Sequence, residues 1–133
     1  AGGGVALLNT QKSLTTLKTE NPDEATGVQI INKAIESPLR IIVENSGGEG
    51  SVVVSKILDG KDNFGYNAKD GTFVDMLKEG IIDPKKVTRV ALENAASVAG
   101  MILTTECALV DIKEEAAPAM PPMGGGGGMP GMM

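Results

Sequence analysis

The chain has 133 residues, which is enough for one modest domain. Its net charge is -5 and aromatic residues make up only 2%, whereas a general nucleic-acid binder needs a basic surface and stacking rings. It has no histidine and a single cysteine, Cys107, which excludes Ser-His and Cys-His catalytic couples, zinc sites built from His and Cys, and a disulfide within the chain.

The first half of the chain predicts helices. Leucines at positions 7, 14 and 17 recur at helical spacing after the glycines at 2–4. A second helix is expected to begin at Pro22 and to continue until residues 45–50 end it, with a kink at Pro38 because proline removes one helical hydrogen bond. Further apolar residues beside its apolar face predict that this helix is buried on much of its circumference.

The middle of the chain predicts shorter elements than the first half. Residues 52–58 form an apolar run for which a helix is favoured over a strand, and residues 59–71 carry the Gly, Asn and Asp signals of loops and hairpins. Within them, the alternation of Phe64, Tyr66 and Ala68 predicts a short strand. Residues 74–79 predict a short helix closed by Gly80.

The longest helix is predicted after the pair Asp83-Pro84, in which Asp83 caps the free N–H groups and Pro84 fits the first turn. Small and apolar residues then form a stripe to position 102. Residues 108–113 alternate and predict a strand. That strand needs a partner, either the strand at 64–68 or another chain.

The last 18 residues, 116–133, contain no charged residue and are rich in glycine and methionine. Ordering them would cost more backbone entropy than their small apolar surface offsets, so we expect a disordered Gly/Met tail after a folded region of residues 1–115. Two interpretations of the tail stay open: an end without a role, or a mobile and weakly adhesive set of methionine side chains.

Three features allow both a ligand-binding and an ordinary structural interpretation. The glycines at 2–4 either present bare N–H groups to an anion or sugar hydroxyl, or form a plain flexible N-terminus, and they lack the Lys and Ser/Thr of a P-loop. Asp83 either caps a helix or binds ribose hydroxyls. The stretch Gly65-Tyr66-Asn67-Ala68 is either a tight turn or backbone that faces a flat ring. No carboxylate pair has the spacing of an acid/base couple.

Several ordered motifs then match one known family along the whole chain. They are residues 1–7 (AGGGVAL), 37–40 (SPLR), 65–68 (GYNA), 80–89 (GIIDPKKVTR), 94–100 (NAASVAG), 104–107 (TTEC) and the Gly/Met tail. With these motifs the chain resembles the C-terminal segment of the equatorial domain of the bacterial GroEL-type (group I) chaperonins.

The resemblance implies a mainly α fold, the helical half of a chaperonin equatorial (ATPase) domain, with a short β-hairpin, a C-terminal strand that pairs with a neighbouring subunit, and the disordered tail. It implies ATP as the cofactor, with Mg²⁺ in the intact protein but no metal ligand and no catalytic residue in this chain. The implied ATP contacts are backbone at Gly3, the adenine contacts Asn67, Ala68 and Lys69, Ile81 packed on the base, and Asp83 on the ribose. Lys69 departs from the small residue expected there, so its contact would be through the backbone or absent.

The resemblance also implies partners. These are identical subunits in a heptameric double ring, a co-chaperonin of the GroES type and unfolded proteins, the last two bound through domains that this chain does not contain. The family's phosphate loop, magnesium carboxylate and water-positioning carboxylate lie upstream of Ala1, so we expect this chain alone to hydrolyse no ATP. A lone cysteine and the lack of a membrane-span pattern or leader predict a cytoplasmic protein with no membrane and no nucleic-acid partner.

Two interpretations of function therefore stand. The chain is a piece of an ATP-dependent protein-folding chaperonin, which the absence of an initiator Met favours, or it is a stand-alone, non-catalytic helical interaction module or truncated relic.

Overall fold

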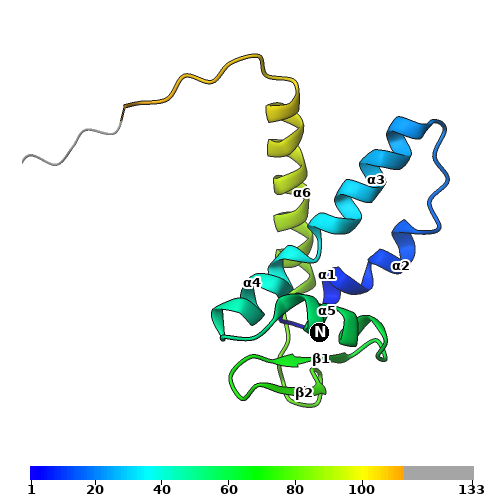
Figure 1. Ribbon diagram of the computed structural model, residues 1–133, viewed down its shortest axis with the longest axis vertical. Helices are drawn as coiled ribbons and strands as arrows, with labels where there is room; N and C mark the ends of the chain where they lie inside the picture. The colour runs from blue at the N-terminus through cyan, green and yellow to red at the C-terminus, as the bar shows by residue number, and fades with distance from the viewer. Residues whose placement is uncertain (113–133) are drawn as a thin grey trace, which may run out of the picture.

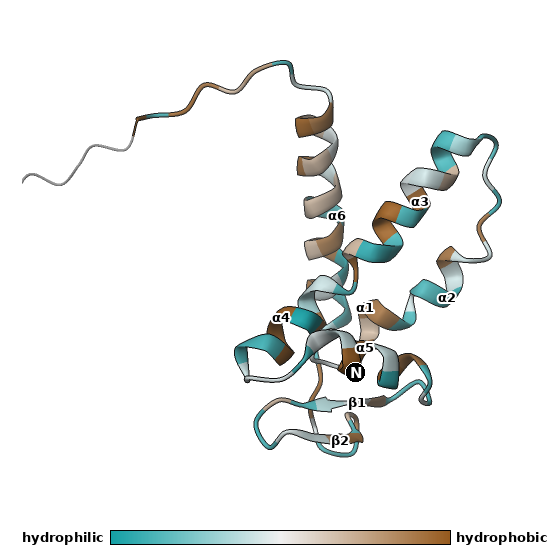
Figure 2. Ribbon diagram, viewed as in Figure 1, coloured by the Kyte–Doolittle hydropathy of each residue, from teal (hydrophilic) through white to brown (hydrophobic). Residues whose placement is uncertain are grey.

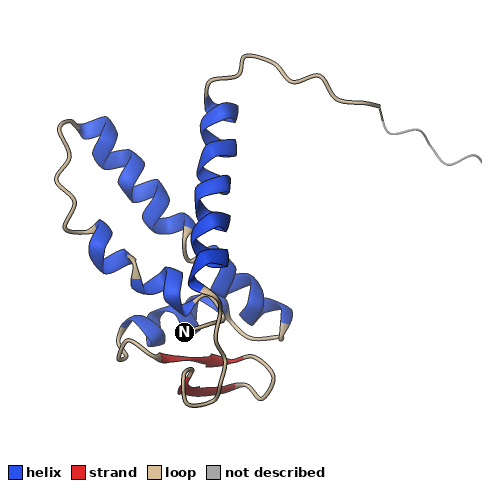
Figure 3. Ribbon diagram, turned by 180° about the vertical axis from the view of Figure 1, so that it is seen from behind, coloured by secondary structure: helices blue, strands red, loops and turns tan. Residues whose placement is uncertain are grey.

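The structure is a computed structural model in which residues 1–112 are described. Figures 1 and 3 show a mainly helical chain with one small hairpin, which confirms the predicted fold class. The elements are α1 (Val5–Asn9), α2 (Gln11–Leu14), α3 (Pro22–Ala34), α4 (Ser37–Asn45), α5 (Gly50–Leu58), β1 (Phe64–Asn67), β2 (Thr72–Asp75) and α6 (Lys85–Leu103). The predicted tail, residues 116–133, lies outside the described residues.

The buried core lies between α1, α4, α5 and the hairpin. It is built from aliphatic side chains and one methionine, as expected from a sequence this poor in aromatic residues: Val5, Leu8, Leu39, Val43, Val53, Val54, Ile57 and Met76. The three aromatic side chains pack on the margin of this core, and the rings of Phe64 and Phe73 stack with their centroids 5.5 Å apart. The favoured helix at 52–58 is confirmed as α5, which supplies three of these core residues.

Helices α3 and α6 differ from the others because neither buries a side chain among the described residues. Both project away from the body of the molecule (Figure 1). Apolar residues lie along the length of α6 and in the C-terminal half of α3 (Figure 2). Ile30 of α3 is 64% exposed and Ile102 of α6 is 68% exposed. The prediction that the second helix is buried on much of its circumference is therefore wrong for residues 22–34, because contact with α2 covers only part of that stretch.

The helix that was expected to run from Pro22 until residues 45–50 end it is divided rather than kinked. Asn21 caps α3, with its Oδ1 accepting a hydrogen bond from the Glu24 N–H at 2.9 Å. The helix ends after Ala34, and a new one begins at Ser37, which places Pro38 in a first turn where its missing N–H costs nothing. Within the first predicted helix, Thr10 similarly separates α1 from α2, and Leu17 lies beyond both.

The junction between α3 and α4 is held by one half-buried carboxylate. Glu36 Oε2 accepts a hydrogen bond from Arg40 at 2.8 Å and one from Lys33 at 3.1 Å. Its Oε1 accepts from Gln11 Nε2 at 3.3 Å, and that same nitrogen donates to the Asn32 carbonyl at 2.8 Å. The contacts of this carboxylate therefore connect α2 to α3 and α4.

The hairpin corrects one prediction. Strands β1 and β2 pair antiparallel, with Phe64 opposite Asp75 and Asn67 opposite Thr72. The strand predicted at 64–68 is confirmed except for its last residue. The helix predicted at 74–79 is wrong, because its first two residues complete β2 and the rest form a turn that ends at Gly80, whose φ is 71°. Cross-strand pairing and the full burial of Met76 outweigh the local helical pattern.

Two further predictions near the C-terminus need correction. The long helix is confirmed as α6, but its N-cap is Pro84 with no side-chain cap hydrogen bond, so Asp83 is not the cap. Residues 108–112 form no strand, and Leu109 is 99% exposed. The described sheet contains only β1 and β2, so residues 108–112 do not pair with the strand predicted at 64–68, and pairing with another chain stays a prediction. No helix within residues 1–112 has the length and apolarity to cross a membrane.

Candidate functional site

A surface hollow of about 510 Å³ lies where four distant segments of the chain meet. Its lining residues are Gly3, Ile42, Tyr66, Asn67, Ala68, Lys69, Asp70, Glu79 and Ile81. Five of the six predicted site residues are among them, and the sixth, Asp83, is not. The segments are the glycine-rich N-terminus, α4, the turn of the hairpin and the residues that lead into α6 (Figure 1).

The N-terminal glycines are fixed in place by close backbone contacts. The Gly2 N–H donates a hydrogen bond to the Ile81 carbonyl at 2.9 Å, and a Cβ on Gly2 would lie 3.1 Å from that same oxygen. Gly3 and Gly4 have φ angles of 63° and 83°, in the left-handed region that favours glycine. The alternative interpretation of a plain flexible N-terminus is therefore wrong for residues 2–4, since the fold requires glycine there.

The turn between β1 and β2 forms the polar wall of the hollow. The Asn67 carbonyl accepts the Gly71 N–H at 2.9 Å, and the Asn67 Oδ1 accepts the Lys69 N–H at 3.0 Å. The Asn67 Nδ2 donates to Asp70 Oδ2 at 2.8 Å. This wall thus offers backbone atoms together with three polar side chains.

The apolar part of the lining comes from two isoleucines, Ile81 and Ile42. Ile81 is half-buried, packs against the core, and donates its N–H to the Met76 carbonyl at 2.8 Å. Ile42, on α4, is 38% exposed and adds a second apolar side chain. A hollow with apolar faces, a few polar groups and this volume has the character of a small-molecule site.

These lining residues support the binding of a small molecule. The charged side chains of the lining are Lys69, Asp70 and Glu79, which contribute one positive and two negative charges. Within residues 1–112, no group of three or more His, Cys, Asp or Glu side chains is arranged to hold a metal ion. Asp83 is exposed and lies two residues beyond Ile81, with a carboxylate that does not cap α6.

Sequence reasoning missed four lining residues. Ile42 was assigned to a helix face, and Glu79 lies in the turn that was predicted as a helix. Tyr66 and Asp70 flank the predicted residues, and the closeness of Asp70 to Asn67 depends on the turn. No periodic signal marks these four positions as neighbours of Gly3, because the contact is made by the tertiary fold.

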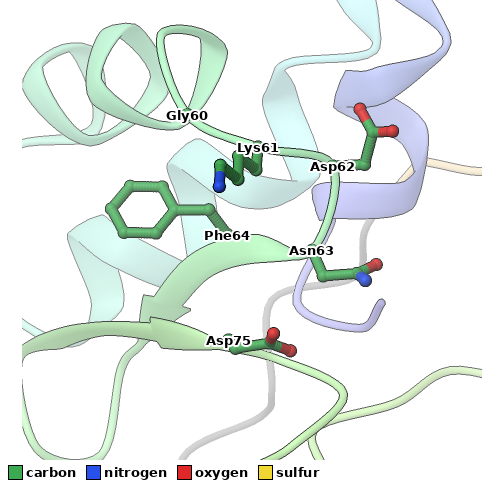
Figure 4. Close-up of a pocket in the computed structure, with 6 residues that line it drawn as sticks. All are labelled: Gly60, Lys61, Asp62, Asn63, Phe64 and Asp75. Carbon is green, nitrogen blue, oxygen red and sulfur yellow. The ribbon is translucent and has the colours of Figure 1, made fainter.

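A second hollow, shown in Figure 4, lies at the other end of β1 and is lined by Gly60, Lys61, Asp62, Asn63, Phe64 and Asp75. Its acidic groups already have partners. Asp62 turns away from the Phe64 ring and pairs with Lys12 at 3.0 Å, while Asp75 Oδ1 accepts the N–H groups of the two residues that follow Met76. These contacts give both carboxylates a role in stabilising the fold, and no ligand is needed to explain their positions.

Comparison with known proteins agrees with the fold. The sequence matches the TCP-1/cpn60 chaperonin family over residues 1–113. The structure is similar to an open-state monomer of a group II chaperonin from Methanococcoides burtonii, with a TM-score of 0.68, 25% sequence identity, and coverage of 78% of this chain and 27% of that chain. This chain thus spans little more than a quarter of that protein, and the predicted likeness to part of a chaperonin equatorial domain is confirmed. On this evidence the chain belongs to the TCP-1/cpn60 chaperonin family.

Proposed function

We propose that this chain supplies the adenine and ribose side of the ATP site of a protein-folding chaperonin and takes part in the contacts between identical subunits of its ring. The observation that carries the nucleotide part is the convergence of Gly3, residues 67–69 and Ile81 around one hollow. These positions come from three separate motifs of the sequence, and the fold brings them to one place.

The hollow suits an adenosine group. A flat base packs between apolar side chains such as Ile42 and Ile81, and the backbone of residues 67–69 faces the polar edge of such a ring. The Lys69 N–H already donates to Asn67 Oδ1, so the backbone atom that Lys69 offers to a ligand is its carbonyl oxygen. Asp83 has an exposed carboxylate near the entrance of α6 and is proposed as the ribose ligand. ATP supplies the phosphoanhydride bond; this chain's residues bind and orient the base and sugar.

Titration of the isotopically labelled 133-residue chain with adenosine tests this proposal by nuclear magnetic resonance. We expect shifts at Gly3, residues 67–69 and Ile81. Ala68→Trp fills the hollow and is expected to abolish these shifts, whereas Ala96→Trp on the exposed surface of α6 is a matched control that leaves them unchanged. Shifts that appear instead around residues 60–64, or that persist in Ala68→Trp, would contradict the proposal.

The same chain is expected to hydrolyse no ATP. Phosphoryl transfer needs phosphate donors, a metal ion and a positioned water together. The hollow provides the base end of a site, and the residues that line it form no metal cluster. Steady-state phosphate release with ATP and Mg²⁺ should equal the buffer blank, and release above the blank would overturn this assignment of roles.

A narrower proposal rests on the sequence motifs. The motifs around residues 65–68 and 80–89 favour the bacterial GroEL-type group, with a heptameric double ring, a GroES-type co-chaperonin, Mg²⁺ beside the nucleotide and a cytoplasmic location. Ring symmetry of the native complex, measured by electron microscopy, tests it. Sevenfold rings are expected. Any other symmetry would contradict the assignment to the GroEL-type group but would not affect the assignment to the chaperonin family.

One observation favours a second candidate, a helical interaction module. Apolar side chains on α3 and α6 are exposed, which suits packing against another polypeptide. Peptide mapping of the native protein separates the two candidates. Peptides that extend well before Ala1 support the chaperonin subunit, and a native species that begins at Ala1 supports the module.

A further inference from the structure

We infer that Asp70 is a positioning residue of the hollow: its carboxylate holds the Asn67 side-chain amide and thereby fixes the wall formed by residues 67–71. The inference deepens the proposed function and rests on it. Asp70 acts through Asn67, so no direct contact between Asp70 and the base is required.

The argument begins with the Asn67 side chain, because both of its polar atoms are used inside the turn. Its Oδ1 accepts the Lys69 N–H at 3.0 Å, and its Nδ2 donates to Asp70 Oδ2 at 2.8 Å. These are the two side-chain hydrogen bonds that residues 67–71 make among the described residues. The Asn67 amide is therefore committed to shaping the turn, and the adjoining backbone is left to face a ligand.

The opposite side of the turn is braced by Tyr66. A Cβ built on Gly71 would lie 3.6 Å from the Tyr66 hydroxyl oxygen, and one built on Gly48 would lie 3.4 Å from it. The ring of Tyr66 also meets Phe73 of β2 edge to face, with centroids 5.3 Å apart. The body side of the turn is thus held by packing, while the solvent side is held by the hydrogen bond to Asp70.

The bond to Asp70 fixes the position of the wall relative to the rest of the hollow. The turn closes through the Gly71 N–H to the Asn67 carbonyl at 2.9 Å, with Gly71 at a φ of 70°. Without Asp70, Nδ2 loses its partner and the Asn67 amide rotates toward water. The Lys69 N–H then loses a fixed acceptor, and residues 68 and 69 gain conformational freedom that a bound base must remove.

Two variants of the full 133-residue chain test the inference with adenosine as the probe. Asp70→Ala removes the acceptor, and we expect adenosine affinity to fall about threefold to tenfold. Asp70→Asn keeps an acceptor oxygen in the same place and is expected to restore most of that affinity. Asp62→Ala is the matched control, because it removes one exposed carboxylate from the second hollow and should leave adenosine binding unchanged.

A second readout needs no ligand. In Asp70→Ala, the resonances of the Asn67 side-chain amide should move toward those of a solvated asparagine, while in Asp70→Asn they should stay near the wild-type positions. An Asp70→Ala chain with wild-type amide resonances and wild-type adenosine affinity would overturn the inference. So would equal losses of affinity in Asp70→Ala and Asp70→Asn, which would point to the charge. Failure of the wild-type chain to bind adenosine while the amide resonances change as expected would instead refute the proposed function.

Discussion

The close contact between Gly4 and the core predicts that Gly4→Ala strongly lowers the free energy of unfolding. Gly4 precedes α1 with a φ of 83°, and a Cβ there would lie 2.9 Å from the Leu39 backbone nitrogen and 3.0 Å from its Cα. The contact is with helical backbone in the first turn of α4, which cannot move aside as the end of a flexible side chain can.

Two separate terms make up the expected loss. An L-residue in the left-handed region costs about 1–2 kcal/mol. The steric conflict with Leu39 adds about 1–3 kcal/mol, the usual range for overpacking a core. The sum is about 2–5 kcal/mol, a large part of the roughly 5–15 kcal/mol that stabilises a typical domain.

Urea unfolding followed by circular dichroism measures the effect, with two glycines as matched controls. Gly47 has a φ of 84° but nothing within 4 Å of its Cβ position, so Gly47→Ala carries the backbone term alone. Gly27 lies inside α3, also with nothing within 4 Å, and Gly27→Ala is expected to stabilise by about 0.5–1 kcal/mol. The extra steric term of about 1–3 kcal/mol should place the midpoint for Gly4→Ala about 0.3–3 M below that of Gly47→Ala. Equal midpoints would refute the argument from contact with α4.

Two further outcomes are expected. Burial raises the pKa of Glu36, but hydrogen bonds from Arg40, Lys33 and Gln11 outweigh burial and hold its pKa below the usual value. Its stabilisation is therefore present above the unfolded-state pKa and lost as the pH falls through the lower folded value, so the thermal midpoint should drop more between about pH 6 and pH 3 for the wild type than for Glu36→Gln. Parallel pH profiles would contradict this. The exposed apolar residues of α6 predict self-association of the 133-residue chain, and Ile102→Lys should shift sedimentation toward the monomer, whereas a wild-type chain that is already monomeric at high concentration would exclude it.

Local signals predicted the elements whose causes are local. Asn21 and Pro22 mark the start of α3 because capping and the first helical turn are decided within four residues. The second strand of the hairpin was missed because residues 74 and 75 are also compatible with a helix. Pairing with β1 decides between the two structures, and a single sequence does not show that pairing.

The site was predicted in part because its motifs resemble a known family, and composition alone would not have found it. Ile81 and Gly3 are nearly eighty residues apart in the sequence, and no periodic pattern predicts that they lie close together. The hydrogen bond from Gly2 to the Ile81 carbonyl joins them. Asp83 was assigned to a helix cap by the same local logic, and there that logic failed because Pro84 begins the helix itself.

The positions of the buried side chains also bear on the order in which the chain is made. Every buried hydrophobic side chain of the described residues lies between Val5 and Met76, and α6 begins at Lys85. A polypeptide leaves the ribosome from its N-terminus at about 5–20 residues per second, so this core can close about 1–5 s before α6 has fully emerged. The long helix thus emerges after the core residues, and its apolar surface needs protection from other nascent chains later than theirs does.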